Sequence, residues 1–435
     1  MTPLLHHHLA ASWLFLAVSL WGAWFTFNAY RPMATHRYLS IVSFFAGWLT
    51  AELALHHIAW QAVATLGFVW AGALDAWPGR VGLAITLVSW AGLAGCLRSA
   101  RTAEAVVERA LRAALGDDYP ARIRPDLAAA LAPRIDWAHI LFPFRVRHPE
   151  VERIRDVQYR RVAGVNLKLD VYRSMRRPTG CPVLLQVHGG AWIVGSKNEQ
   201  GLPLMRLLAA RGWVCVSADY RLSPHATFPE HLIDLKHAIA WIREHVAEYG
   251  GDPDLLVVTG GSAGGHLASL VALTANDPEY QPGIEHVDTT VCACVSFYGV
   301  YDFTDRHGMW RNLGLRDLLE RQVMKAALDE APEAYERASP MSCIHAGAPP
   351  FFVLHGSRDT MVPVEEARRF CQSFRETARA PIVYAEIPGA QHAFEIFPSL
   401  RSALVLHGVE RYLAWVVTQR RAARAPAAPS RSAAS

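Results

Sequence analysis

The stretch Leu255–His266 most constrains the fold of this chain, because it places a serine between a buried strand and a helix. Four apolar residues, Leu255 to Val258, predict a short strand, and the apolar run Leu267–Leu273 predicts a helix. The turn between them has the pattern Gly-x-Ser-x-Gly around Ser262. A turn this tight holds the serine in a strained backbone and leaves room only for glycine at its flanks. The hydroxyl then projects above the sheet edge, and the next amide is free to bind an oxyanion.

Strand and helix patterns alternate through residues 151–417, which predicts an α/β fold with a mostly parallel sheet and helices on both faces. An antiparallel strand pair is expected first, between Val157 and Tyr172 around a turn at Gly164. The remaining strands are expected at Val183–Val187, Val214–Ala218, Leu255–Val258, Val291–Phe297, Phe351–Leu354 and Ile382–Ile387. The helices are expected at Leu202–Arg211, Phe228–Glu248, Ala263–Thr274, Pro363–Thr377 and Ser399–Val417. In such a sheet the ligand site lies beyond the carboxyl ends of the strands.

Residues with catalytic chemistry follow four of these strands. His188-Gly189-Gly190-Ala191-Trp192 comes after the first parallel strand, and its glycine-rich backbone can donate amides to a developing oxyanion. Ser262, Asp359 and His392 follow three later strands. A serine hydroxyl is a poor nucleophile, so an imidazole must take its proton and a carboxylate must orient that imidazole. The chain order Ser, Asp, His is that of the α/β-hydrolase triad.

Other side chains near the strand ends compete for the roles of base and acid. The competitors are His188, His266, His355 and Asp302. His266 lies one turn into the helix that follows Ser262, where its ring should point away from the hydroxyl. His355 lies too close in sequence to the expected acid to be easily oriented by it. We interpret Tyr298 and Asp302 as residues that support the site.

Taken together, these motifs resemble the hormone-sensitive-lipase-like carboxylesterases of the α/β-hydrolase superfamily. The resemblance covers about residues 151–417 and depends on His188–Trp192, Asp219–Pro224, Gly260–Gly265, Asp359 and His392. It implies the α/β-hydrolase fold and the hydrolysis of carboxylic esters without a metal or an organic cofactor. By motif, it implies Ser262 as nucleophile, His392 as base and Asp359 as orienting acid. The oxyanion donors that it implies are the amides of Gly189, Gly190 and Ala263, with Ala191 as a substitute.

The chain departs from that family's pattern in two places. Ala191 stands where a third glycine is usual, which keeps the amide but can tighten the acyl pocket. The region that supplies the family's cap here leads out of an apolar segment, so the substrate's size stays open. The same loop also resembles that of kynurenine-formamidase-like amide hydrolases, and the layout resembles membrane-anchored prenylcysteine methylesterases. We therefore expect a small-molecule or lipid-like ester as substrate, with amidase, formamidase and lipid deacylase as alternatives.

Residues 1–100 are the most apolar part of a chain in which 51% of the residues are hydrophobic. The run Leu9–Tyr30 has no charged residue and is long enough to cross a bilayer of about 30 Å as a helix. A second run, Tyr38–Leu74, is too long for one simple span, and a third extends over Val81–Leu97. We expect about three transmembrane spans here rather than a cleaved signal peptide or a soluble bundle.

The positions of the arginines predict the orientation of these spans. With three spans, the basic segments Arg31–Arg37 and Arg98–Arg112 fall on the same side, which the positive-inside rule assigns to the cytoplasm. We therefore expect a multi-pass membrane protein with a cytoplasmic catalytic domain. Seven cysteines, an odd number, favour free thiols in a reducing compartment. Glu52, His56 and His57 lie at membrane depth, and we favour a break between two half-spans over a functional site.

Two segments flank the expected catalytic domain. Residues 101–150 begin with apolar residues at helical spacing, including Val107, Leu111 and Leu115, and predict an amphipathic linker or a cap. Residues 418–435 mix arginine with Ala, Pro and Ser and predict a disordered basic tail. The net charge of +4 comes from scattered residues without a nucleic-acid-binding motif. The membrane is therefore an expected partner of this chain, and nucleic acid is not.

Overall fold

The computed structural model describes residues 3–131, 135–144 and 148–424, and eight strands in it form one sheet in the order β1-β2-β4-β3-β5-β6-β7-β8. The strands are β1 (Val151–Val162), β2 (Val165–Ser174), β3 (Cys181–Val187), β4 (Val214–Ala218), β5 (Gly251–Gly261), β6 (Cys294–Phe297), β7 (Phe351–Gly356) and β8 (Ile382–Ile387). β1 pairs antiparallel with β2, and β2 pairs antiparallel with β4. All other neighbours are parallel. The expected antiparallel pair followed by a parallel sheet is confirmed.

Helices cover both faces of this sheet, because alternate side chains of its strands point to opposite faces. Val183 and Leu185 of β3 pack with α8, α9 and α12, whereas Leu184 packs with α7, α13 and the second half of α4 (Trp77–Leu115). These helices are α7 (Leu202–Ala210), α8 (Glu230–His245), α9 (Ala263–Leu273), α12 (Val364–Thr377) and α13 (Leu400–Arg424). Two short helices, α10 (Gly314–Leu318) and α11 (Pro332–Arg337), lie in the excursion between β6 and β7.

Most strands lie where the sequence predicts them, and β6 differs. Its ladder begins at Cys294, whereas the prediction began at Val291. Residues just before β6 still bond to β5, as in the 2.6 Å hydrogen bond from the Cys292 amide to the Leu256 carbonyl. They therefore approach the sheet as an irregular segment. In the other direction, β5 starts at Gly251, four residues earlier than predicted.

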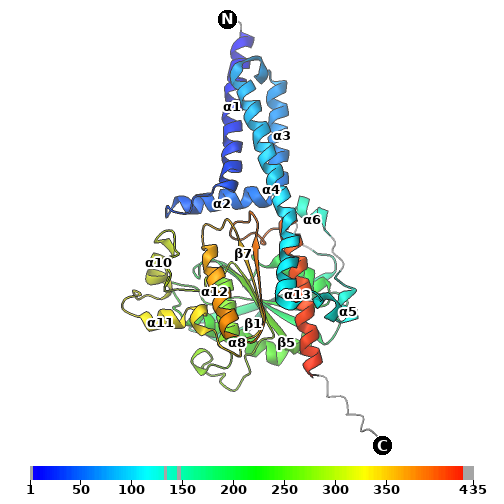
Figure 1. Cartoon of the computed structure of the whole chain (residues 1–435), viewed down its shortest axis with the longest axis vertical. Coiled ribbons are helices and arrows are strands. Elements are labelled where there is room, and N and C mark those ends of the chain that lie inside the picture. Colours follow the sequence, from blue (N-terminus) through cyan, green and yellow to red (C-terminus); the bar gives the residue numbers. More distant parts are fainter. Residues whose placement is uncertain (1–2, 132–134, 145–147, 425–435) are drawn as a thin grey trace, which may run out of the picture.

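The first four helices precede the sheet domain, and all but the second contribute to a stalk that stands on it (Figure 1). They are α1 (Pro3–Tyr30), α2 (Leu39–Glu52), α3 (Ala54–Trp70) and α4 (Trp77–Leu115). By length and composition, α1 and α4 could each cross a membrane. The pair α2 and α3 would add a third span only if counted as one, because the two helices are bent by 88° at their break. In Figure 1, α3 runs beside α1 and α4, whereas α2 lies crosswise between the stalk and the sheet.

The expected boundary at residue 100 falls inside a continuous helix, because α4 runs for 39 residues from the stalk into the sheet domain. Val107 and Leu111 of α4 are fully buried in the core cluster that includes α13. After α4, the chain forms the short helices α5 (Pro125–Ala128) and α6 (Trp137–Leu141). The first part of the expected linker is therefore a component of the core of the sheet domain.

A buried ion pair joins the break between α2 and α3 to the sheet domain. Glu52 is the last residue of α2, and its carboxylate contacts the guanidinium of Arg401 on α13. The Ser399 hydroxyl also donates to the Glu52 carboxylate, at 2.7 Å. Both charged side chains are buried. The polar break predicted at Glu52 is therefore the place where the stalk is fastened to the domain beneath it.

The end of the chain is more ordered than the sequence indicates. Helix α13 continues to Arg424, so residues 418–424 of the expected disordered tail are helical. The Arg424 guanidinium pairs with the Asp252 carboxylate at 2.9 Å, beside the start of β5. Residues 425–435, the rest of that expected tail, lie outside the described residues. All seven cysteines have free thiols, as the odd count predicted.

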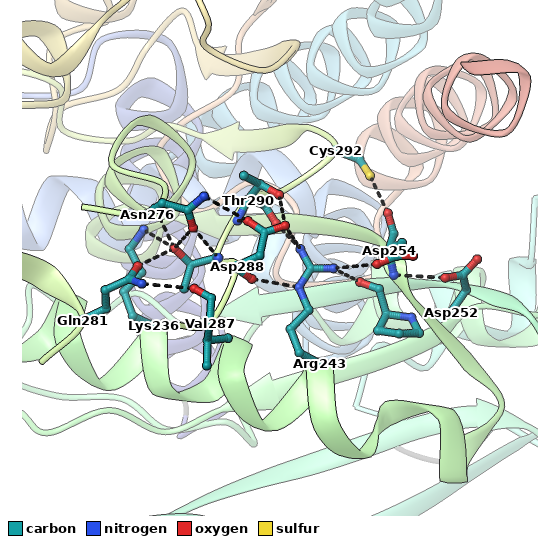
Figure 2. A network of polar contacts seen from close by, with 12 residues as sticks. Lys236, Arg243, Asp252, Asp254, Asn276, Gln281, Val287, Asp288, Thr290 and Cys292 are labelled. Atoms are coloured by element: carbon teal, nitrogen blue, oxygen red, sulfur yellow. Dashed lines mark hydrogen bonds and ion pairs between the residues drawn. The ribbon is translucent and has the colours of Figure 1, made fainter. Parts of the chain in front are cut away.

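A polar network fastens the segment between α9 and β6 (Figure 2). It lies where the parallel strands begin, which we call the amino edge of the sheet. Lys236 on α8 donates to the carbonyls of Val271 and Thr274, at 3.1 and 2.7 Å, and so satisfies the carboxyl end of α9. Arg243, also on α8, donates to the carbonyls of Asp288 and Thr290, at 2.9 and 2.6 Å. These contacts hold the far end of the helix that begins after Ser262.

Candidate active site

Ser262 sits at the turn between β5 and α9, in a conformation that few residues adopt. Its φ is +58° and its ψ is −125°, so its backbone is strained. A Cβ added at Gly260 would collide with the Gly264 carbonyl, and one added at Gly264 would collide with the Val187 carbonyl. The two flanking glycines are therefore required by close packing of backbone, as the sequence pattern predicted.

The loop after β3 lies directly against this serine. A Cβ at Gly189 would lie 3.2 Å from the Ser262 Cβ. The Gly189 amide donates to the Gln200 side-chain oxygen at 2.6 Å, so this expected oxyanion donor is already engaged. Among the described residues, the amides of Gly190 and Ala191 have no such acceptor. The loop's free donors are therefore Gly190 and the expected substitute Ala191, which itself has a φ of +52°.

The turn after β4, expected to support the site, bonds to this loop at two points. The Tyr220 hydroxyl donates to the His188 carbonyl at 2.9 Å, and the two rings stack with centroids 4.3 Å apart. The Ser223 amide donates to the Trp192 carbonyl at 2.9 Å. The loop's shape is therefore held from outside rather than by its own glycines alone.

Asp359 and His392 meet beneath the cavity that Ser262 lines. The His392 Nδ1 lies 2.7 Å from the Asp359 Oδ2, and the other carboxylate oxygen accepts the amides of Met361 and Val362. Burial alone would raise the pKa of Asp359, but the charge of His392 and the hydrogen bonds from His392 and His355 lower it below its usual range. The carboxylate therefore stays ionised and can orient the imidazole.

Of the competing histidines, His266 is engaged away from the cavity, whereas His355 contacts the expected acid itself, although we expected it to lie too close in sequence for that. His266 accepts a hydrogen bond from the Trp192 indole at 3.2 Å and contacts the Ala338 carbonyl at 2.7 Å through its other nitrogen. Burial lowers the pKa of His266 to about 3. The His355 Nε2 contacts the Val362 carbonyl and the Asp359 carboxylate. Of the four histidines considered, only His392 lines the cavity of the described structure.

The alternative acid, Asp302, also has other partners. Its carboxylate pairs with the Arg306 guanidinium at 3.1 Å and accepts the Thr304 hydroxyl at 2.6 Å. Tyr298, by contrast, lies against the site, because its ring centroid is 4.4 Å from that of His392. Of the two residues that we expected to support the site, Tyr298 therefore contacts the imidazole, whereas Asp302 bonds to other residues.

Sequence reasoning missed two polar residues that position these groups. The Gln391 side-chain oxygen accepts the amides of Thr360 and His392, at 2.8 and 2.9 Å, and so ties the acid's loop to the base's loop. The buried Glu395 carboxylate accepts the Tyr298 hydroxyl at 2.5 Å. Burial raises the pKa of Glu395 to about 7, although the bond from Tyr298 lowers it. The sequence signal that could have indicated both residues is their position one and three residues from His392.

The cavity above these residues has a volume of about 730 Å³. Ser262, Asp359 and His392 line its floor, and its walls come from the start of α2 and from residues 310–322 around α10. No residue of 101–150, where we expected a linker or cap, lines this cavity of the described structure. The reason is that α4 and α6 lie on the α13 side of the sheet domain (Figure 1).

Within the described residues, no group of three or more His, Cys, Asp or Glu side chains could hold a metal ion.

Comparisons with known proteins show which proteins this chain is similar to. The BD-FAE family model matches residues 169–374. The chain is 42% identical to the probable carboxylic ester hydrolase LipM of Mycobacterium tuberculosis, over 92% of this chain and 93% of that protein. It is 38% identical to the esterase LipQ of the same organism, over 88% of this chain and 86% of that protein.

Solved structures with this fold include a truncated carbohydrate esterase from gut microbiota. It is 20% identical, with a TM-score of 0.51, and the match covers 60% of this chain and 95% of that one. The α/β fold and the relatives define the class of protein as a carboxylic ester hydrolase. More particularly, the chain belongs to the hormone-sensitive-lipase-like carboxylesterases of the α/β-hydrolase superfamily.

Proposed function

We propose that the protein is a membrane-anchored serine esterase in which Ser262, His392 and Asp359 act as nucleophile, base and orienting acid. The observation that carries this proposal is the 2.7 Å contact between Asp359 and His392 at the floor of the cavity that Ser262 lines. An ionised carboxylate on Nδ1 leaves Nε2 as the unprotonated nitrogen that can accept a proton.

In the first half of the reaction, the Ser262 oxygen attacks the ester carbonyl while His392 takes the hydroxyl proton. The carbonyl oxygen gains negative charge, and the amides of Gly190, Ala191 and Ala263 donate to it. The tetrahedral intermediate then collapses, and His392 gives the proton to the leaving alcohol. The acyl group remains on Ser262.

In the second half, His392 takes a proton from water, and the resulting hydroxide attacks the acyl-enzyme carbonyl. The acid is released when His392 returns the proton to the Ser262 oxygen. The cycle needs no group besides the chain's own residues and water.

We also propose that α1 and α4 cross the membrane and that the bent pair of α2 and α3 supplies a third crossing through its α3 arm, with the sheet domain in the cytoplasm. The supporting observation is the distribution of arginines. Arg31 and Arg37 lie between α1 and α2, and Arg98 and Arg101 flank the part of α4 that contacts the sheet domain through Ser99 and Ala100. Arg80 lies at the other end of the stalk, at the start of α4. The positive-inside rule places the more basic end in the cytoplasm.

The test of the triad is Ser262→Ala in the full-length protein in detergent. We expect the kcat for p-nitrophenyl butyrate to fall by about 10⁴-fold or more, because no other group can form the acyl-enzyme. Ser269→Ala is the matched control, since Ser269 lies two turns further along α9 and donates to the Gly265 carbonyl. Full turnover by the Ser262 variant would refute the proposal.

Sidedness is tested separately, by labelling intact cells with fluorophosphonates. A membrane-permeant probe should label the wild-type protein and not the Ser262→Ala protein, and an impermeant probe should label neither. Labelling of the wild-type protein by the impermeant probe would place the catalytic domain outside the cytoplasm.

A further inference from the structure

The start of helix α2 lines the catalytic cavity. The helix lies crosswise at the base of the stalk (Figure 1). Its inner face packs on the site. The Phe44 ring meets the His392 ring edge-on, with centroids 5.9 Å apart, and the Trp48 ring stacks on Phe397 at 4.9 Å. Ile41 lines the cavity itself.

The rotation of α2 about its own axis is set by polar contacts at its middle and its end. The Ser43 hydroxyl donates to the Asn28 side chain of α1 at 2.8 Å, and the Asn28 amide donates back to the Ser43 carbonyl at 2.6 Å. At its end, Glu52 forms the buried ion pair with Arg401. The outer face of α2 therefore cannot turn inward without breaking these contacts.

That outer face is apolar and open. Tyr38, just before the helix, Val42 and Phe45 follow one another at helical spacing and are 67%, 53% and 50% exposed. Phe27, near the carboxyl end of α1, is also 64% exposed. Proteins in water rarely expose a continuous apolar band of this kind. Because it joins a helix long and apolar enough to cross a membrane, the occupant that fits it is lipid.

The cavity reaches this same region. Its lining runs from Ser262 and His392 to Tyr38 and Ile41 at the start of α2. On the opposite wall are apolar residues of α10, including Leu315 and Leu318. Beside them, Arg37 pairs with Asp317 and so joins the segment before α2 to α10.

We propose that the catalytic cavity opens at the membrane surface beside α2, and that the substrate is an ester whose hydrocarbon part is dissolved in the bilayer. This inference rests on the proposed function, since it needs a Ser262 esterase held at the membrane by its stalk. The substrate enters past the outer face of α2 without first passing into water. Each methylene that leaves a bilayer for water raises the free energy, so this route favours long acyl chains.

The experiment uses the full chain reconstituted in phosphatidylcholine vesicles, with two substrates. One is p-nitrophenyl acetate, dissolved in water, and the other is 4-methylumbelliferyl oleate, dissolved in the vesicles. Phe45→Glu places a charge on the outer face of α2, where it should lift the helix from the lipid. We expect turnover of the oleate to fall about tenfold, while turnover of the acetate changes less than twofold. Val42→Glu should do the same.

Met175→Glu is the matched control. Met175 is 58% exposed and lies just beyond the end of β2, beside the start of β4, at the amino edge of the sheet and away from α2. This variant should leave both activities unchanged. The inference is overturned if both α2 variants keep full oleate turnover, or if they lose both activities equally. Phe45→Gln, which adds no charge, repeats the comparison if Phe45→Glu fails to fold. If the proposed function itself is wrong, the result is different: Ser262→Ala would then retain acetate turnover.

Discussion

Among the described residues, the polar groups of the network at the amino ends of the parallel strands (the amino edge) are satisfied, whereas several at the carboxyl ends (the carboxyl edge) are not. At the amino edge, the residues labelled in Figure 2 satisfy one another, and none has a buried side-chain nitrogen or oxygen without a partner in the described structure. At the carboxyl edge, strain and unsatisfied groups gather around His392. Ser262 has a positive φ, and the Gln391 amide, one Glu395 oxygen and the His355 Nδ1 are buried without a hydrogen bond among the described residues.

This difference separates stability from function along the same strands. A satisfied network lowers the energy of the folded state, whereas strain and unpaired polar groups raise it and persist only when surrounding structure holds them. The satisfied groups at the amino edge therefore stabilise the fold, and this stabilisation offsets the cost of the strained and unpaired groups at the carboxyl edge. Substitutions at the two edges should affect different measurements.

The largest effect is expected at the carboxyl edge, from Asp359→Asn. The amide can still accept the backbone bonds, but it cannot hold His392 in the tautomer that accepts a proton. We expect kcat for p-nitrophenyl butyrate to fall by about 10⁴-fold, with a small change in melting temperature.

The matched control is Asp288→Asn at the amino edge. Asp288 accepts the Asn276 side chain and the Thr290 amide, and an asparagine oxygen can accept both. Its kcat should stay within twofold of wild type. Equal losses in the two variants would remove the distinction between the edges.

A stability effect is expected at the amino edge, from Arg243→Met. This change leaves the carbonyls of Asp288 and Thr290 without their charged donor. We expect the free energy of unfolding to fall by about 3 kcal/mol, while kcat per folded molecule is unchanged. Chemical denaturation measures the first quantity and active-site titration the second.

Arg161→Met is the comparison for that variant, because Arg161 is exposed on β1. It should change the free energy of unfolding by less than about 0.5 kcal/mol. A fall in kcat for Arg243→Met would mean that the amino edge also shapes the active site.

The smallest effect is a pH dependence, expected from Glu395→Gln. With its pKa raised to about 7, Glu395 in the folded protein holds a proton that the unfolded chain releases above its ordinary value of 4.5. Wild-type stability should therefore fall as pH rises from about 4.5 to 7. The glutamine variant lacks this loss and should be more stable than wild type by about 2 kcal/mol at pH 8, with no difference near pH 4.

Melting temperatures of both proteins across this pH range measure the effect. Glu365→Gln serves as control, since Glu365 lies at the exposed start of α12 and pairs with Arg311. A difference between Glu395→Gln and wild type that does not change with pH would contradict the assignment of the slope to Glu395.

The sequence alone determined the sheet and the order in which a serine, an aspartate and a histidine follow its strands, for a local reason. Buried strands such as Val214–Ala218 and Ile382–Ile387 are short apolar runs bounded by turn residues, and both have the predicted bounds. The Gly-x-Ser-x-Gly pattern around Ser262 likewise specifies its own backbone, because close contacts at the flanking glycines exclude side chains.

Only the tertiary structure decided which distant segments meet over that edge. Nothing local in α2 shows that Phe44 covers His392, or that Glu52 pairs with Arg401, because those contacts join residues more than 340 positions apart. The same holds for Gln200, whose side-chain oxygen accepts the Gly189 amide, so that we propose the amides of Gly190 and Ala191 as oxyanion donors instead. Hydrophobic periodicity specifies which face of an element is buried, whereas its partner is selected by the packing of the whole chain.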